Sequence, residues 1–107
     1  MKVIYSPLAK SDILEAVNYI AGRLHNPSAA EEMLKELDRV IQQISQFPYS
    51  CELYRSEKPL NAEIRRVRVK NYVMYYVARQ DFVEVWRFLH GRRDREQILD
   101  NAENEPG

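Results

Sequence analysis

The chemistry that this sequence could support lies mostly in its last third, where basic side chains gather around one histidine. They are Arg65, Arg66, Arg68, Lys70, Arg87, Arg92 and Arg93, with His90 among them. Arginine holds phosphates and carboxylates through paired hydrogen bonds and keeps its charge at physiological pH. Histidine changes its charge near neutrality and can transfer a proton. The pattern therefore predicts a site for an anionic partner, with His90 as a candidate proton donor.

The distribution of charge supports this interpretation. The chain has 107 residues, 16 Lys and Arg, 16 Asp and Glu, and a formal net charge of zero. Residues 61–95 nevertheless carry nine basic and four acidic groups, whereas residues 96–107 carry four acidic groups and no basic one. A neutral protein is not expected to coat nucleic acid broadly, but its basic segment can bind one local anionic target.

Other classes of site lack a signal in the sequence. The three glycines are scattered and form no phosphate-binding loop, and no GxSxG or CxxC motif occurs. His25 and His90 are too isolated to indicate zinc. Cys51 is the single cysteine, so an internal disulfide is excluded, as is typical of a reducing compartment. We therefore expect no cofactor and no metal.

No apolar segment is long enough to reach or cross a membrane. The first apolar run is Val3–Tyr5, far shorter than the core of a signal peptide. No run approaches the roughly 20 residues that span a bilayer. We therefore expect a cytoplasmic protein without a membrane partner.

Two amphipathic helices must position these side chains. Ser6-Pro7 predicts a helix start, because Ser caps and Pro suits the first helical position, and apolar residues then repeat at helical spacing as far as Leu24. Asp12 and Glu15 lie near the positive end of this helix dipole. Asn26-Pro27 predicts the second helix, and its apolar stripe runs from Ala30 to Ile44 before Phe47-Pro48 ends it.

Strands account for most of the remaining chain. Residues 2–5 predict a first strand and residues 48–61 a loop, after which the apolar period changes from 3.6 to 2. Strands are predicted at 64–70, 72–79 and 82–90, and their short connections imply an antiparallel meander. The predicted fold is α+β, in the order β-α-α-β-β-β, with a helical hairpin packed on a small, mostly antiparallel sheet. Residues 1–99 form the single domain, with a short helical end at 93–99, and residues 100–107 a disordered acidic tail. The place of the first strand in the sheet stays open.

Alternation along the strands indicates where the cations lie. Val67 and Val69 share one face of their strand, and Arg66, Arg68 and Lys70 share the other, which predicts a partly solvated second face. Antiparallel neighbours are expected to bring Arg66 or Arg68 near Arg87 and His90. The alternative is that each Arg is a solvated strand residue paired with Asp or Glu, and that His90 only stabilises its turn.

Several segments in this order resemble the RelE/ParE superfamily of bacterial toxins from type II toxin–antitoxin modules, over about residues 1–99. These segments are Ser6–Ala9, Asp12-Ile13, Tyr19-Ile20, Asn26–Ala30, Phe47-Pro48, Arg66–Tyr76 and Val85–Asp94. The resemblance implies a growth-inhibiting toxin that an antitoxin encoded beside it neutralises. It also implies that the toxin–antitoxin complex binds operator DNA through the antitoxin.

The resemblance implies two alternative targets. ParE-like members inhibit DNA gyrase and are not enzymes, whereas RelE-like members cleave mRNA on the ribosome. For a ribonuclease, Arg66, Arg68 and Arg87 would stabilise the developing charge and His90 would supply the proton. The zero net charge and the absence of a lysine-rich stretch before the central strands favour the ParE-like interpretation. A module that only binds its antitoxin is the third possibility. For target or antitoxin binding we predict Arg66, Arg68, Lys70, Arg87, Arg92 and Arg93.

Overall fold

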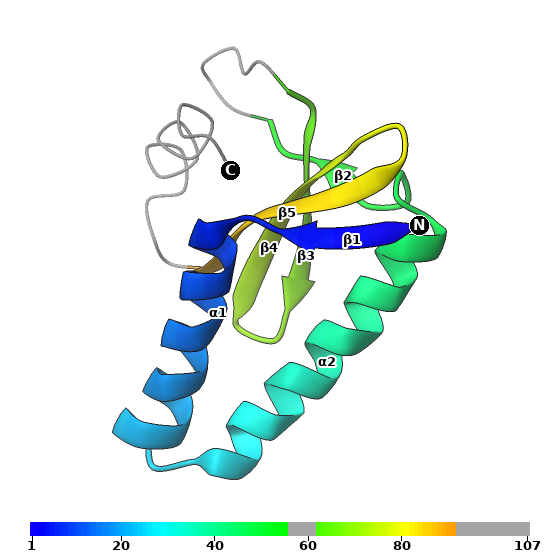
Figure 1. The fold of residues 1–107 in the computed structure, drawn as a ribbon. Helices are drawn as coiled ribbons and strands as arrows, with labels where there is room; N and C mark the ends of the chain where they lie inside the picture. Colours follow the sequence, from blue (N-terminus) through cyan, green and yellow to red (C-terminus); the bar gives the residue numbers. More distant parts are fainter. Residues whose placement is uncertain (56–61, 92–107) are drawn as a thin grey trace.

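A computed structural model describes residues 1–55 and 62–91 of the chain (Figure 1). The elements are β1 (Lys2–Tyr5), α1 (Pro7–Asn18), a π-helical turn η1 (Tyr19–Arg23), α2 (Pro27–Gln46), β2 (Glu52–Leu53), β3 (Ile64–Val69), β4 (Tyr72–Ala78) and β5 (Phe82–His90). Two helices packed on one sheet form the predicted α+β architecture. The predicted helical end at 93–99 and the acidic tail at 100–107 lie outside the described residues.

Both helices begin where the sequence predicts. The Ser6 side chain accepts a hydrogen bond from the Ala9 amide at 3.0 Å, and the Asn26 side chain accepts one from the Ala29 amide at 3.1 Å. Each cap precedes a proline in the first turn. The first helix differs from the prediction at its end, because regular α-helix stops at Asn18 and a π-helical turn follows.

The sheet has the order β1-β5-β4-β3-β2. β1 runs parallel to β5 at one edge, while the other neighbours are antiparallel, so the sheet is mixed. The predicted meander of three strands is therefore correct, and the first strand occupies the edge beside the last one. The prediction of an unbroken loop at 48–61 is wrong, because Glu52 and Leu53 pair with Arg66 and Arg65. Two residues are too few to produce a recognisable alternation.

The hairpin between β3 and β4 turns at Lys70 and Asn71. Lys70 has a φ of 55°, in the left-handed region that side chains other than glycine seldom adopt. It consequently lies outside β3, which ends at Val69. The prediction that Lys70 continues the alternation of Arg66 and Arg68 is therefore wrong.

Apolar side chains fill both faces of the central strand β4. Toward the helices, Met74 and Tyr76 pack in a core that includes Val40 and Ile44 of α2. On the opposite face, Tyr75 and three other buried side chains form a second cluster, namely Ile64, Val77 and Leu89. The predicted solvation of this second face therefore holds for the exposed Arg68 and not for the buried part.

Within residues 1–55 and 62–91, no helix is both long enough and apolar enough to cross a membrane.

Candidate functional site

A groove of about 770 Å³ lies between α1 and the neighbouring ends of β4 and β5. Aromatic side chains from the sheet form part of its lining. The rings of Tyr72 and Phe88 stack with centroids 5.0 Å apart, and the His90 ring meets Tyr72 edge-on at 5.3 Å. Because Tyr72 and Phe88 are buried and tightly stacked, this side of the groove is a rigid apolar surface.

The α1 side of the groove combines apolar and polar groups. Leu14 is 62% exposed and Tyr19 is 44% exposed, although both are large apolar side chains. Tyr19 and Arg23 belong to the π-helical turn η1, and such turns often occur at functional sites. An apolar groove with a few polar groups at its rim suits a segment of polypeptide.

The Tyr72 phenol is a neutral hydrogen-bonding group on the groove surface. Burial raises the pKa of Tyr72 above its ordinary value, and the nearby Tyr19 and Glu15 raise it further. Tyr72 therefore keeps its proton at physiological pH. It does not add a negative charge beside Glu15.

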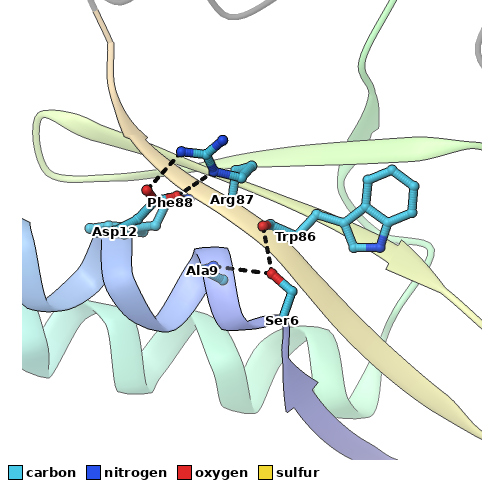
Figure 2. A network of polar contacts seen from close by, with 6 residues as sticks. All are labelled: Ser6, Ala9, Asp12, Trp86, Arg87 and Phe88. Atoms are coloured by element: carbon cyan, nitrogen blue, oxygen red, sulfur yellow. Dashed lines mark hydrogen bonds and ion pairs between the residues drawn. The ribbon is translucent and has the colours of Figure 1, made fainter. Parts of the chain in front are cut away.

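A buried ion pair joins α1 to β5 beside this groove (Figure 2). Arg87 donates from Nε to Asp12 Oδ2 at 2.6 Å and from Nη2 to Asp12 Oδ1 at 2.8 Å. The Phe88 amide donates to Asp12 Oδ2 at 3.0 Å. The Arg87 side chain is only 12% exposed, and the Asp12 side chain is only 7% exposed. The Asp12 carboxylate thus accepts three hydrogen bonds in a place with little water.

The position of this network follows from the end of β1. β1 pairs with β5 only as far as Val85, so the next backbone groups of β5 need other partners. The Ser6 amide donates to the Val85 carbonyl, and the Ser6 hydroxyl donates to the Trp86 carbonyl at 2.8 Å. Asp12 then receives the Phe88 amide. The start of α1 thereby replaces the missing strand along this edge.

The structure separates the cations that the sequence predicts to gather. β4 lies between β3 and β5. Its residue Tyr75 pairs with Arg66 of β3 on one side and with Arg87 of β5 on the other. Strands are about 4.8 Å apart, so the two backbones are about 10 Å apart. Each side chain also has a carboxylate partner, since Arg87 binds Asp12 and Arg66 binds Glu52 at 2.9 Å. Arg66 and Arg87 thus bind separate carboxylates.

Arg68 and His90, in contrast, do share a site. Both line a cavity of about 430 Å³ at the hairpin end of the sheet, together with Asn71 and Gly91. Lys70 is exposed beside them in the turn. Arg65 is engaged elsewhere, because its Nη1 donates to the Cys51 carbonyl at 2.8 Å. The predicted binding residues Arg92 and Arg93 lie outside the described part of the chain. No group of His, Cys, Asp or Glu that could hold a metal ion occurs among the described residues.

Comparison with known proteins identifies the family. The family model described as "ParE toxin of type II toxin-antitoxin system, parDE" matches residues 3–95. The chain belongs to the ParE toxin family. It is therefore a type II toxin, and an antitoxin is its implied partner. No curated protein sequence matches the chain.

A solved structure shares the fold of this ParE-family toxin. It is a chain of the "Chromosomal ParDE TA system from P. aeruginosa", with a TM-score of 0.66 and 13% sequence identity. The match covers 84% of the toxin and 95% of the other chain. At this identity the likeness establishes the architecture alone, and it agrees with the fold predicted from the resemblance.

Sequence reasoning missed the groove and the partner of Arg87 in this ParE-family toxin. From the sequence, Asp12 is predicted only to interact with the dipole at the start of its helix, whereas in the structure its carboxylate binds Arg87. Leu14 carried a usable signal, because it is a large apolar residue outside the apolar stripe of its helix. No local signal indicates which cation Asp12 binds, since Arg87 lies 75 residues away.

Proposed function

We propose that this toxin inhibits bacterial growth by binding DNA gyrase in the cytoplasm and is neutralised by a cognate antitoxin encoded beside it. Membership of the ParE family supports a toxin of this type. The observation that carries the choice of gyrase over mRNA is the buried ion pair between Arg87 and Asp12.

The physical reason is the charge that RNA cleavage requires. Attack by a ribose 2′-hydroxyl builds negative charge on the phosphate, which cations must stabilise. Arg87 instead lies in a buried pair with Asp12, and releasing it would leave a carboxylate uncompensated at large cost. Arg66 is held by Glu52. The Arg66 pair is largely exposed and weak, so the argument against RNA cleavage rests on the buried Arg87.

The groove beside α1 supports the antitoxin part of the proposal. Leu14 and Tyr19 are exposed apolar anchors, and the stacked rings of Tyr72 and Phe88 provide a rigid surface opposite them. A segment of the antitoxin that orders on binding would bury these groups. In this proposal the resulting complex binds operator DNA through the antitoxin.

A ribosome-dependent ribonuclease is the second candidate, and one observation favours it. Arg68 and His90 line the same cavity, so a cation and a titratable imidazole face one space. Such a pair could stabilise a phosphate and donate a proton to the leaving oxygen. Neither Arg68 nor His90 is needed for the gyrase proposal.

Induced expression separates the two candidates. In induced cells, gyrase inhibition predicts intact transcripts and DNA damage signalling. With purified components, it predicts that adding the toxin stops gyrase from supercoiling DNA. Primer extension on RNA from induced cells tests the alternative. Cuts in phase with codons that disappear in Arg68→Ala and His90→Gln, with gyrase unaffected, would replace the proposed target with mRNA.

A further inference from the structure

The turn that follows α2 exposes aromatic side chains to solvent. Phe47 is 62% exposed and Tyr49 is 63% exposed, and Leu53 in β2 is 37% exposed. We call Phe47, Tyr49 and Leu53 the aromatic platform. Single exposed apolar residues are ordinary, but two aromatic rings within three residues of one turn are a concentrated apolar surface.

The backbone beneath the aromatic platform is held in place from several directions. The Tyr76 hydroxyl donates to the Pro48 carbonyl at 2.9 Å, and the Ser50 hydroxyl donates to the Phe47 carbonyl at 2.7 Å. Arg65 Nη1 donates to the Cys51 carbonyl at 2.8 Å and to the Tyr49 carbonyl at 3.4 Å. Tyr76 is itself fully buried. The turn is therefore anchored to the core while its apolar side chains point outward.

This combination is what a binding surface requires. A turn that is already ordered loses little conformational entropy when a partner docks. Tyr, Phe and Arg are enriched at the centres of protein interfaces. The Arg65 guanidinium lies 5.2 Å from the centre of the Tyr49 ring, which combines an aromatic surface with a cation.

Arg65 places a positive charge at the aromatic platform. Arg65 lies against Tyr49, and Arg55 is exposed two residues after Leu53. The carboxylate within the platform's own strand, that of Glu52, is paired with Arg66. A partner that fits this surface therefore carries acidic groups around an apolar anchor.

The aromatic platform follows the last residue of α2, whereas two residues of the groove, Tyr19 and Arg23, precede its first residue. A helix of 20 residues is about 30 Å long. A single short helix in the groove would not reach the platform, but an extended arm of the same chain would.

We propose that the aromatic platform is a second docking site for the antitoxin, which anchors an apolar side chain of an extended acidic arm there while another segment occupies the groove. This inference rests on the proposed neutralisation by an antitoxin and adds a separate contact surface to it. The turn's hydrogen bonds to Tyr76 and Arg65 keep the surface ready in the free toxin.

The test compares variants of the full chain in complex with the protein encoded by the adjacent open reading frame. Phe47→Ala combined with Tyr49→Ala should weaken binding about 30-fold or more, the effect of losing an interface hot spot. Leu34→Ala is the matched control, because Leu34 is an exposed apolar residue of α2, 38% exposed, outside both surfaces. Calorimetric titration gives the affinities, and circular dichroism shows whether each variant is folded.

A second measurement does not depend on the folding of any variant. Hydroxyl-radical footprinting of the wild-type complex should show Phe47 and Tyr49 protected relative to the free toxin. Unchanged affinity of a folded double variant, or unprotected rings in the complex, would overturn the platform proposal. So would unchanged antitoxin affinity together with lost growth inhibition, since the platform would then contact the target. If the wild-type chain bound no antitoxin at all, the proposed function itself would fail, and the platform proposal with it.

Discussion

At the scale of single residues, Asp12 has the largest structural consequence. Its carboxylate accepts two hydrogen bonds from Arg87 and one from the Phe88 amide, and it is almost fully buried. Buried ion pairs add little net stability over apolar packing, but removing one partner leaves an uncompensated charge. Arg87, predicted from the sequence as a binding residue, thus has a structural role that we propose as its main one.

Asp12→Ala should lower the free energy of unfolding by about 3–5 kcal/mol, because Arg87 would stay buried without its carboxylate. Urea denaturation followed by circular dichroism measures this change. Glu15→Ala is the control, since it removes an exposed carboxylate one turn along the same helix and should change stability by less than about 0.5 kcal/mol. Equal stability of the two variants would show that the ion pair is dispensable.

Tyr76→Phe should cost about 1 kcal/mol at neutral pH, because it removes the hydrogen bond to the Pro48 carbonyl. Burial first, and then the neighbouring Cys51, raises the pKa of Tyr76 above the ordinary value of about 10. A pKa that is higher in the folded state stabilises the fold below about pH 10, and this contribution is lost as the pH rises through the folded value.

As the pH rises above 10, the free energy of unfolding should therefore fall less for Tyr76→Phe than for the wild-type protein. Urea midpoints between pH 7 and pH 11 test this, with the exposed Tyr49→Phe as control. Identical alkaline profiles of the Tyr76 variant and the wild-type protein would contradict the assignment.

At the scale of elements, the β3–β4 hairpin contains a strained residue. Lys70 adopts a φ of 55°, and a side chain in this region costs about 1–2 kcal/mol. The neighbouring turn is also tied to the end of β5, because the Gly91 amide donates to the Asn71 carbonyl at 3.0 Å. The hairpin is held in this conformation by the strands and by this contact.

Lys70→Gly should raise the free energy of unfolding by up to about 1 kcal/mol, because glycine adopts a positive φ without strain, although its greater freedom in the unfolded chain offsets part of the gain. Thermal melting measures the effect. Asn71→Gly is the control, because φ at position 71 is not positive and the substitution should not stabilise. A less stable Lys70→Gly variant would show that the lysine side chain itself supports the turn.

At the scale of the whole molecule, the two helices cover one face of a mixed sheet and leave two separate apolar surfaces exposed. One is the groove at α1, and the other is the aromatic platform after α2. Contiguous exposed apolar surfaces usually mark sites where a partner binds. We therefore expect this toxin, whose net charge is zero, to bury both surfaces against a partner.

Antitoxin binding should therefore raise the melting temperature of the toxin. At a free antitoxin concentration of 100 times Kd the stabilisation is about 2.7 kcal/mol. For a domain of this size, that corresponds to an increase of about 10 °C or more. Leu14→Ala combined with Tyr19→Ala should reduce the increase at the same antitoxin concentration, since these side chains line the groove. An equal increase in this folded variant would exclude the groove as the binding site.

The sequence by itself determined which segments form helices and strands. Capping by Ser6 and Asn26, the change of apolar period after residue 61 and the short turns between the last three strands are signals within a few residues of each other. Such signals act locally, so they predict the element order and the meander well. The sequence also shows where the basic residues concentrate, but it does not predict which carboxylate each of them binds.

Only the tertiary structure decided how distant residues meet. It placed β1 beside β5, inserted β4 between the two groups of arginines and joined Asp12 to Arg87 across 75 positions of sequence. It also anchored the backbone of the aromatic platform through hydrogen bonds from Tyr76 and Arg65. These contacts depend on how whole elements pack, and packing joins side chains that no periodicity of the chain connects.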